Sequence, residues 1–266
     1  MTATNKLRER EEQSHSLLCV GLDSELSKIP SQFAHSHIPQ YEFNKWIIEQ
    51  THEYVSSFKL NFAFYEARGA QGWTELSMTM DYLRTHHPAI CTIADAKRGD
   101  IGNTNNGYVQ GIFDELGFDA ITLHPYLGQE ALQPFLDRSD KISIILARTS
   151  NPGSPEFQDR MSDGKKLWEH VATQVATTWN KNENCMLVVG ATYPDELAQI
   201  RSIVGEMTLL IPGIGAQGGD LKKTVTAGMN SQKKGMMISS SRSIIFSRTP
   251  NMEARKLRDA INDIIK

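Results

Sequence analysis

The sequence predicts a closed (β/α)₈ barrel, and three features of its pattern support that fold class. Eight short apolar runs of strand length recur along the 266 residues, and segments with helical spacing lie between them. The runs are apolar almost throughout, as expected of parallel strands that are covered on both faces. The composition does not change at the middle of the chain, which favours a closed barrel over an open doubly wound sheet. We therefore expect one domain spanning residues 1–266.

The expected strands and helices alternate along the chain. The strands cover residues 17–22, 55–60, 90–94, 120–123, 142–147, 186–189, 208–211 and 236–238. Helical spacing and plausible caps are found, among other segments, in residues 104–116, 129–136, 165–179, 194–204 and 219–227. Residues 252–265 place Leu257, Ile261 and Ile264 on one side and form the last expected helix of the ring.

Two connections are longer than barrel loops usually are. They cover residues 23–40 after the first strand and 151–163 after the fifth. In a barrel both lie on the face that carries active sites. The second connection begins Asn151-Pro152-Gly153-Ser154 and is rich in turn-forming residues. That composition suits a lid over a site and equally a plain solvent loop, so both interpretations stay open.

Composition and charge narrow the function classes. The formal net charge is −3 and the isoelectric point is near 6.2, so no general field attracts polyanions. We expect no nucleic-acid binding, and any phosphate site must be local. Residues 1–12 are polar and charged, and no apolar run approaches the roughly 18 residues of a membrane span. We therefore expect a cytoplasmic protein that does not bind membranes.

Cysteine and histidine usage argues against disulfides and metals. Cys19, Cys91 and Cys185 lie in or beside apolar runs and are odd in number, which predicts buried, reduced thiols. No metal-ligand spacing such as HExxH occurs, so we expect no metal. His124 follows the fourth strand without a visible partner, which favours a structural hydrogen-bonding role. The four tryptophans fall in helical segments and are expected to pack helices against the barrel.

Polar residues gather where the expected strands end, and in a barrel these ends open into one shared cavity. The strand ends carry Asp23, Lys59, Asn61, Asp95, Lys97, Asp100, His124, Thr149 and Ser150. Period-two alternation places Asp95 and Lys97 on the same side of the third strand, with Lys59 beside them on the neighbouring strand. We therefore expect carboxylates and ammonium groups to interleave at this point.

An interleaved array would keep each of its members charged, because a buried charge persists only when it is paired. The carboxylates would favour the protonated form of Lys97, which would make that residue a general acid and not a nucleophile. An ion-pair network with no catalytic task gives the same pattern and is the alternative explanation.

A glycine-rich turn after the seventh strand indicates a phosphate site. It covers residues 212–219, with the sequence PGIGAQGG, and Ser241-Arg242-Ser243 follows the eighth strand. Barrels commonly bind phosphate at these two loops with backbone N–H groups that glycine leaves accessible. The guanidinium group of Arg242 adds a forked cationic partner. Glycines also serve plain turns, so the position in the barrel carries this interpretation.

Taken together, these strand ends resemble the orotidine 5′-phosphate decarboxylase family, in particular its longer bacterial-type branch. The resemblance covers nearly the whole chain. Its carriers are Val20-Gly21-Leu22-Asp23, Phe58-Lys59-Leu60-Asn61, Asp95-x-Lys97-x-x-Asp100-Ile101, Arg148-Thr149-Ser150-Asn151-Pro152, Pro212-Gly213-Ile214-Gly215 with Gln217, and Ser241-Arg242-Ser243. The Asp-x-Lys-x-x-Asp element in a barrel is the most specific of these motifs.

The resemblance implies a cofactor-free decarboxylation of orotidine 5′-phosphate to UMP in de novo pyrimidine biosynthesis. It implies that Lys97 protonates C6 of the pyrimidine as carbon dioxide leaves, within a charged array completed by Lys59, Asp95 and Asp100. The implied substrate-binding residues are Asp23, Asn61, Ile101, Thr104, Ser150, Pro212, Gln217 and Arg242. A homodimer is also implied, in which Asp100 and Thr104 reach into the site of the partner subunit.

Three alternatives remain open. A sugar-phosphate decarboxylase or hexulose-phosphate synthase on the same barrel also carries Asp-x-Lys-x-x-Asp but works through a divalent metal. A Schiff-base aldolase would use Lys97 or Lys59 as a nucleophile, which flanking carboxylates disfavour. A non-catalytic barrel that binds a phosphorylated ligand is the third, and the intact set Lys59, Asp95, Lys97 and Asp100 argues against it.

Overall fold

The computed structural model describes residues 1–214 and 219–266 and contains a closed barrel of eight parallel strands. The strands are β1 (Leu18–Gly21), β2 (Ser57–Asn61), β3 (Cys91–Arg98), β4 (Ala120–Leu123), β5 (Ile142–Arg148), β8 (Cys185–Val189), β9 (Leu209–Pro212) and β10 (Met236–Ser240). They pair in this order, and β10 pairs with β1 to close the ring. The predicted fold class is confirmed, and each expected strand is found close to its expected bounds.

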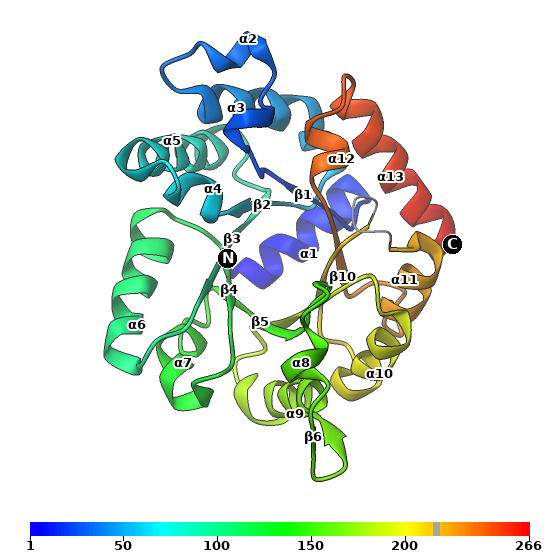
Figure 1. The fold of residues 1–266 in the computed structure, drawn as a ribbon. Helices are drawn as coiled ribbons and strands as arrows, with labels where there is room; N and C mark the ends of the chain where they lie inside the picture. The colour runs from blue at the N-terminus through cyan, green and yellow to red at the C-terminus, as the bar shows by residue number, and fades with distance from the viewer. Residues whose placement is uncertain (215–218) are drawn as a thin grey trace.

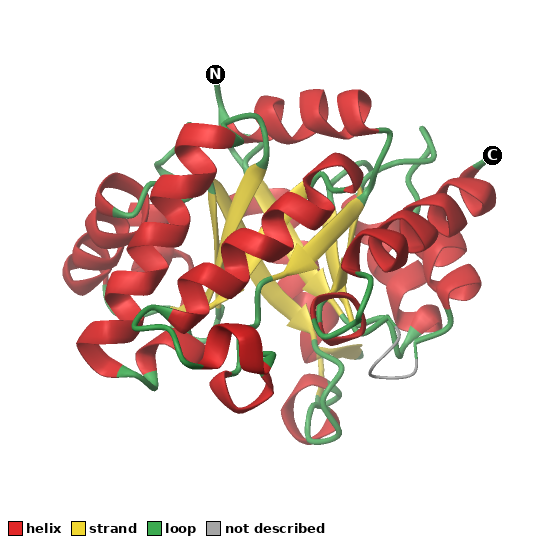
Figure 2. Cartoon of the chain, turned by 90° about the horizontal axis from the view of Figure 1, so that it is seen from above, coloured by secondary structure: helices red, strands yellow, loops and turns green. Residues whose placement is uncertain are grey.

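Helices form a ring around the strands, as Figures 1 and 2 show. The longer ones are α3 (Pro39–Thr51), α5 (Gly69–His86), α6 (Gly102–Val109), α7 (Gly128–Leu136), α9 (Leu167–Gln174), α10 (Pro194–Val204), α11 (Leu221–Gly228) and α13 (Pro250–Ile265). Shorter helical pieces are η1 (Leu26–Lys28), α2 (Ser31–Ala34), η2 (His52–Tyr54), α4 (Ala63–Glu66), η3 (Gln110–Glu115), α8 (Pro155–Gln158), η4 (Val175–Trp179) and α12 (Arg242–Ile245). The main core lies between this ring and the barrel, where Phe43, Phe58 and Trp168 are fully buried.

An N-terminal helix, α1 (Ala3–Ser14), crosses the end of the barrel at which the strands begin (Figure 1). Ala3 and Leu7 pack against the apolar side chains inside the barrel. Lys6 forms an ion pair with Asp119, at 2.7 Å, just before β4. The polar sequence of this segment did not predict a helix. Its buried residues are few and widely spaced, so the apolar pattern is weak even though the helix covers the barrel floor.

The expected helix over residues 165–179 begins later than predicted. Residues Lys165–Lys166 form β7, which pairs with β6 (Met161–Ser162) in an antiparallel hairpin. Asp163 and Gly164 connect them with φ values of 49° and 75°. Positive φ at both turn residues is the geometry that Asp-Gly favours in two-residue hairpins. This dipeptide was the sequence signal for the hairpin that the helical spacing concealed.

The three cysteines are free and buried, which confirms the expectation of buried thiols. Burial raises the pKa of Cys185 to about 12, so this thiol is protonated at neutral pH. Within residues 1–214 and 219–266, no helix has both the length and the apolar character needed to cross a membrane.

Candidate active site

A pocket of about 480 Å³ opens at the end of the barrel where the strands finish. Its lining includes Asp23, Lys59, Asn61, Asp95, Lys97, Thr122, Thr149, Ser150, Asn151, Gln158, Pro212, Gly213, Ile214, Ser239, Ser240, Ser241 and Arg242. Eight of the twelve predicted site residues are in this set: Asp23, Lys59, Asn61, Asp95, Lys97, Ser150, Pro212 and Arg242. The barrel brings them together from six different strand ends, as parallel strands in a closed ring require.

Charged side chains of alternating sign form one wall of the pocket. The Lys59 ammonium group lies 3.8 Å from Asp23 Oδ1 and 2.9 Å from Asp95 Oδ2, and the Lys97 ammonium group lies 2.6 Å from Asp95 Oδ1. The two lysines differ in exposure, because the Lys59 side chain is 7% exposed and the Lys97 side chain is 50% exposed. Lys97 is therefore the more accessible of the two cations to a ligand in the pocket.

Opposite charges, and not burial, decide the ionisation of this wall. Burial alone would lower the pKa of Lys59, but the carboxylates of Asp23 and Asp95 raise it above its ordinary value. Burial alone would raise the pKa of Asp95, but the ammonium groups of Lys59 and Lys97 hold it well below its usual range. Lys59 and Asp95 are therefore both charged at neutral pH.

The strand that carries Asp95 and Lys97 is not regular. Between the pairs Ala94–Ile121 and Arg98–Leu123, β3 contains three residues and β4 contains one. Lys97 has a left-handed backbone with a φ of 47°, which is uncommon for a residue with a side chain. The two side chains do meet, as predicted, but a bulge in β3 brings them together and not the simple alternation on which the prediction relied.

His124 packs against the backbone just after this bulge. Its imidazole lies so close to Gly99 that a Cβ atom at residue 99 would be 2.8 Å from His124 Nε2. The backbone N–H of His124 also donates to the carbonyl of Arg98 at 3.0 Å. Glycine is needed at residue 99 because no side chain fits there, and these contacts are consistent with the structural role expected for His124.

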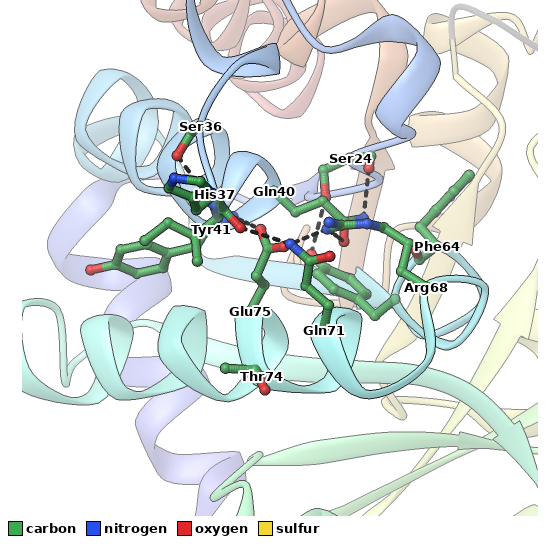
Figure 3. Close-up of polar contacts among 12 residues, drawn as sticks. Ser24, Ser36, His37, Gln40, Tyr41, Phe64, Arg68, Gln71, Thr74 and Glu75 are labelled. Atoms are coloured by element: carbon green, nitrogen blue, oxygen red, sulfur yellow. Dashed lines mark hydrogen bonds and ion pairs between the residues drawn. The ribbon is translucent and has the colours of Figure 1, made fainter.

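A buried polar network anchors the loop that carries Asp23. The side chain of Gln40, on α3, donates to the carbonyl of Ser24 at 2.9 Å, one residue after Asp23. Arg68 in turn donates to Oε1 of Gln40 at 2.7 Å (Figure 3). The loop backbone is thus fixed by side chains that lie behind the pocket.

The network continues to α5, where Glu75 is fully buried. Glu75 forms an ion pair with Arg68, and its other oxygen accepts the backbone N–H of Tyr41 at 2.9 Å (Figure 3). Gln71, one turn earlier on the same helix, donates to the carbonyl of His37 at 2.7 Å. The long connection after β1 is therefore attached to α5 at several points.

Arg148 organises the loop after β5. Its side chain is 1% exposed, contacts the Ser154 hydroxyl and lies 3.3 Å from both Gln158 Oε1 and Asp159 Oδ2. Its guanidinium group also lies 3.9 Å from the ring centroid of Tyr193. These contacts fold residues 151–159 back toward the strand end and place Gln158 in the pocket lining. The loop therefore forms part of the pocket wall, and its role as a lid stays a prediction.

The loops after β9 and β10 form another side of the pocket, next to the end of β1. Pro212 and Arg242 both line it, and Gln217 lies outside the described residues. The ends of β1 and β10 approach closely here, because the hydroxyl of Ser241 donates to the Gly21 carbonyl at 3.0 Å. A Cβ atom at Gly21 would be 2.8 Å from that of Ser241, so only glycine permits this approach.

Asp100, Ile101 and Thr104 are not among the described residues that line the pocket of their own chain. The Asp100 carboxylate accepts the N–H of Ile101 at 2.7 Å, and the Ile101 side chain is 63% exposed. Asn105 fixes this segment, since its side-chain oxygen accepts the N–H of Asp100 at 3.0 Å. The expected contribution of Asp100 and Thr104 to a partner subunit's site stays a prediction, and so does the expected role of Ile101 in substrate binding.

Sequence reasoning missed three polar side chains that shape this face of the barrel: Thr122, Gln158 and Asn105. Thr122 is the second-last residue of β4, and its place near the end of a barrel strand was the signal that could have found it. Gln158 lies in a loop whose path no local pattern predicts. Asn105 is buried on α6 and acts through Asp100, a contact that is visible only once the loop is folded.

Comparison with known proteins places the chain in a family. The sequence profile described as "Orotidine 5'-phosphate decarboxylase / HUMPS family" matches residues 16–257. The chain belongs to this family. A protein of Flavobacterium johnsoniae named orotidine 5′-phosphate decarboxylase is 44% identical over 256 residues, which is 96% of this chain and 93% of that protein.

Solved structures of the same family have the same fold. The Leishmania donovani OMP decarboxylase aligns with a TM-score of 0.90 and 39% identity, over 100% of this chain and 99% of that one. The Plasmodium berghei orotidine 5′-monophosphate decarboxylase aligns with a TM-score of 0.87 and 26% identity, over 98% and 97% of the two chains. The family match includes every strand end that lines the pocket and begins after α1. The resemblance inferred from the strand-end motifs is confirmed.

Proposed function

We propose that the chain decarboxylates orotidine 5′-phosphate to UMP without a cofactor, in de novo pyrimidine biosynthesis. Curated relatives that are 44% identical are named for this decarboxylase activity. The observation that carries the proposal is the half-exposed ammonium group of Lys97, held 2.6 Å from Asp95 inside the array that also contains Lys59 and Asp23. Arg242 lines the same pocket as this array.

The charged wall suits the departure of carbon dioxide from C6 of a pyrimidine. When the C6–carboxylate bond breaks, its electron pair stays on C6, and a fixed ammonium group stabilises the negative charge as it develops. Lys97 then transfers a proton to C6, which forms the C6–H bond of UMP and leaves a neutral amine for solvent to protonate again. The contact with Asp95 holds the Lys97 ammonium group in position before the bond breaks.

The rest of the pocket suits a nucleotide. Asp23 Oδ1 is buried and has no hydrogen-bond partner among the described residues, so it can accept a ribose hydroxyl, with Lys59 as donor beside it. We assign the pyrimidine edge to Ser150, with Asn61 as a further polar contact in the pocket. Pro212 and Ile101 are assigned as walls, and Arg242 and Gln217 bind the phosphate.

We also propose a cytoplasmic homodimer in which Asp100 and Thr104 complete the partner's site. The loops after β3 and β4 expose Ile101, Tyr126 and Leu127, whose side chains are 63%, 87% and 44% exposed. Exposed apolar side chains beside an active-site face are typical of a subunit interface. The closed barrel built from strands along the whole chain supports a single domain, and buried free thiols suit a reducing compartment.

The decisive experiment follows the ultraviolet absorbance of orotidine 5′-phosphate with purified protein. Wild type is expected to convert the substrate, and Lys97→Ala to lower kcat by at least about a hundredfold, because the proton donor is lost. Lys222→Ala removes an exposed lysine of α11 outside the pocket and serves as the control with unchanged kcat.

Metal dependence separates this proposal from the metal-assisted sugar-phosphate enzymes. Among the described residues, no group of three or more His, Cys, Asp and Glu side chains is placed to hold a metal ion. Activity is expected to be unchanged after dialysis against EDTA. Loss of activity in EDTA that a divalent metal restores would contradict the cofactor-free proposal, and a wild type that leaves the absorbance unchanged would contradict the activity itself.

A further inference from the structure

Thr122 is the single residue of β4 that lies opposite the three-residue bulge of β3. It is 1% exposed, and its side chain is part of the pocket lining. In a regular parallel ladder the backbone groups of β3 at this point would bond to the backbone of β4. The bulge interrupts that pairing, so its polar groups need other partners.

The Thr122 hydroxyl supplies a partner to both functional residues of the bulge. It accepts the backbone N–H of Lys97 at 3.0 Å and donates to Asp95 Oδ1, also at 3.0 Å. The Lys97 ammonium group returns to the same Asp95 oxygen at 2.6 Å. Backbone, hydroxyl, carboxylate and ammonium group thus form a closed ring of three contacts.

This ring fixes two degrees of freedom that the chemistry needs. Asp95 Oδ2 accepts from Lys59 at 2.9 Å, so the hydroxyl on Oδ1 completes the orientation of the carboxylate. Lys97 occupies an unfavourable left-handed backbone conformation, which persists only where surrounding contacts hold it. The hydrogen bond from the Lys97 N–H to Thr122 is one such contact, and it acts directly on the residue that carries the proton.

We propose that Thr122 is a positioning residue for the reaction, whose hydroxyl holds the β3 bulge in the shape that directs the Lys97 ammonium group into the pocket. The inference rests on the decarboxylase function proposed above. Thr122 transfers no proton to substrate in this role. Its effect is on the fraction of molecules in which Lys97 and Asp95 are correctly placed, so it should change kcat and leave substrate binding nearly unaltered.

The test compares Thr122→Val, which keeps the branched shape and loses the hydroxyl, with Thr122→Ser, which keeps the hydroxyl. Thr122→Val is expected to lower kcat by about ten- to a hundredfold with KM within about threefold of wild type. Thr122→Ser is expected to recover kcat to within about fivefold of wild type. Thr51→Val is the matched control, since this buried threonine donates to the carbonyl of Ile47 on α3, remote from the pocket.

A second measurement does not depend on turnover. Hydrogen exchange of the Lys97 backbone amide, followed by NMR on the free protein, is expected to be at least about tenfold faster in Thr122→Val than in wild type. Thr122→Ser and Thr51→Val should keep the slow exchange. Amides of β5, such as that of Ile144, should exchange at wild-type rates in all four proteins if the effect is local.

The two measurements separate failure of this inference from failure of the proposed function. Thr122→Val with wild-type kcat, or with unchanged Lys97 exchange, would overturn the positioning role. Equal losses of kcat in Thr122→Val, Thr122→Ser and Thr51→Val would overturn it as well, because they would indicate general loss of stability. A wild type that is inactive on orotidine 5′-phosphate would refute the decarboxylase, and Lys97 exchange would still decide whether Thr122 holds the bulge.

Discussion

Lys59 and Lys97 both pair with Asp95, but their different surroundings suit them to different roles. Lys59 is nearly enclosed, pairs with Asp23 and Asp95, and has a pKa above its ordinary value because both carboxylates favour its charged form over the penalty of burial. Lys97 shares Asp95 but is half exposed to the pocket. A cation that is fixed on all sides can orient a substrate, whereas a cation with one open side can also give up a proton to it.

A different residue, Glu11 on α1, is ionisable in surroundings that disfavour its charge. Burial raises its pKa to about 8, although the positive charges of Lys234 and Arg8 oppose the shift. Its Oε1 has no hydrogen-bond partner among the described residues and faces a cavity of about 300 Å³ at the barrel floor. The carboxyl group is therefore expected to be protonated in the folded protein at neutral pH.

This predicts a pH-dependent loss of stability. Between about pH 4.5 and pH 8 the folded state holds a proton on Glu11 that the unfolded state releases, so the free energy of unfolding falls as pH rises through this window. Glu11→Gln removes the titration and is expected to stabilise the protein relative to wild type by about 1–3 kcal/mol at pH 9 and little at pH 5. Thermal unfolding measured from pH 5 to pH 9 checks this.

Glu12→Gln is the matched control, because the Glu12 side chain is next to Glu11 in the sequence but is 69% exposed. The stability of this variant should follow that of wild type across the pH range. Parallel Tm-against-pH curves for wild type and Glu11→Gln would show that Glu11 titrates as an ordinary surface acid.

At the scale of elements, the sequence predicted the regular strands better than it predicted the bulge in β3 and the paths of the loops. Each strand was visible as an apolar run because burial on both faces leaves a strong local signal, and helix α10 has the predicted bounds. The bulge in β3 was not visible, because two extra residues change register without changing composition. Gln158 and Asn105 were missed for a related reason: their contacts depend on how loops fold back, which local periodicity does not encode.

The connection between α3 and α5 gives an element-scale prediction. Glu75→Gln keeps the side-chain volume but leaves Arg68 without its buried counter-charge, and should lower the free energy of unfolding by about 2–4 kcal/mol. Denaturant titration measures this. Removing both charges in the double variant Glu75→Gln/Arg68→Met should cost less than the sum of the single changes, because no uncompensated charge remains.

Asp81→Asn on the same helix provides the comparison, since Asp81 pairs with Arg84 in solvent and its loss should cost no more than about 0.5 kcal/mol. If Glu75→Gln and Asp81→Asn lower the free energy of unfolding by similar amounts, the network shown in Figure 3 stabilises the fold no more than a surface ion pair does.

At the scale of the whole molecule, closure of the barrel makes residues from six strand ends into one site. That part of the site was predictable, because the rule that active residues lie at the C-terminal ends of strands needs only the strand order. Asp100 and Thr104 are different, because their expected place is in another subunit and a single chain cannot supply it. Exposed Ile101 and Tyr126 mark the surface on which a second copy is proposed to dock.

Shared sites predict complementation between two defective proteins. Lys97→Ala and Asp100→Asn should each have little activity as homodimers, since each lacks one member of every site. After subunit exchange, about half of the dimers are mixed and each has one intact site, so the mixture should recover about a quarter of wild-type kcat. The measurement is the decarboxylation rate before and after exchange.

Mixing Lys97→Ala with the double variant Lys97→Ala/Asp100→Asn restores no intact site and is the control. If exchange between the two single variants leaves the rate at their average, Asp100 acts within its own chain and the shared-site proposal fails.

The bulge in β3 also limits how this protein can change. A deletion of one residue between Ala94 and Arg98 would leave the composition almost intact, yet every following side chain would move to the opposite face of the strand. A substitution in this stretch alters only the contacts of one side chain, whereas a change in its length would turn the amine of Lys97 away from the barrel mouth. The segment should therefore tolerate point mutation at some positions but neither insertion nor deletion. Surface loops, in contrast, tolerate changes in length.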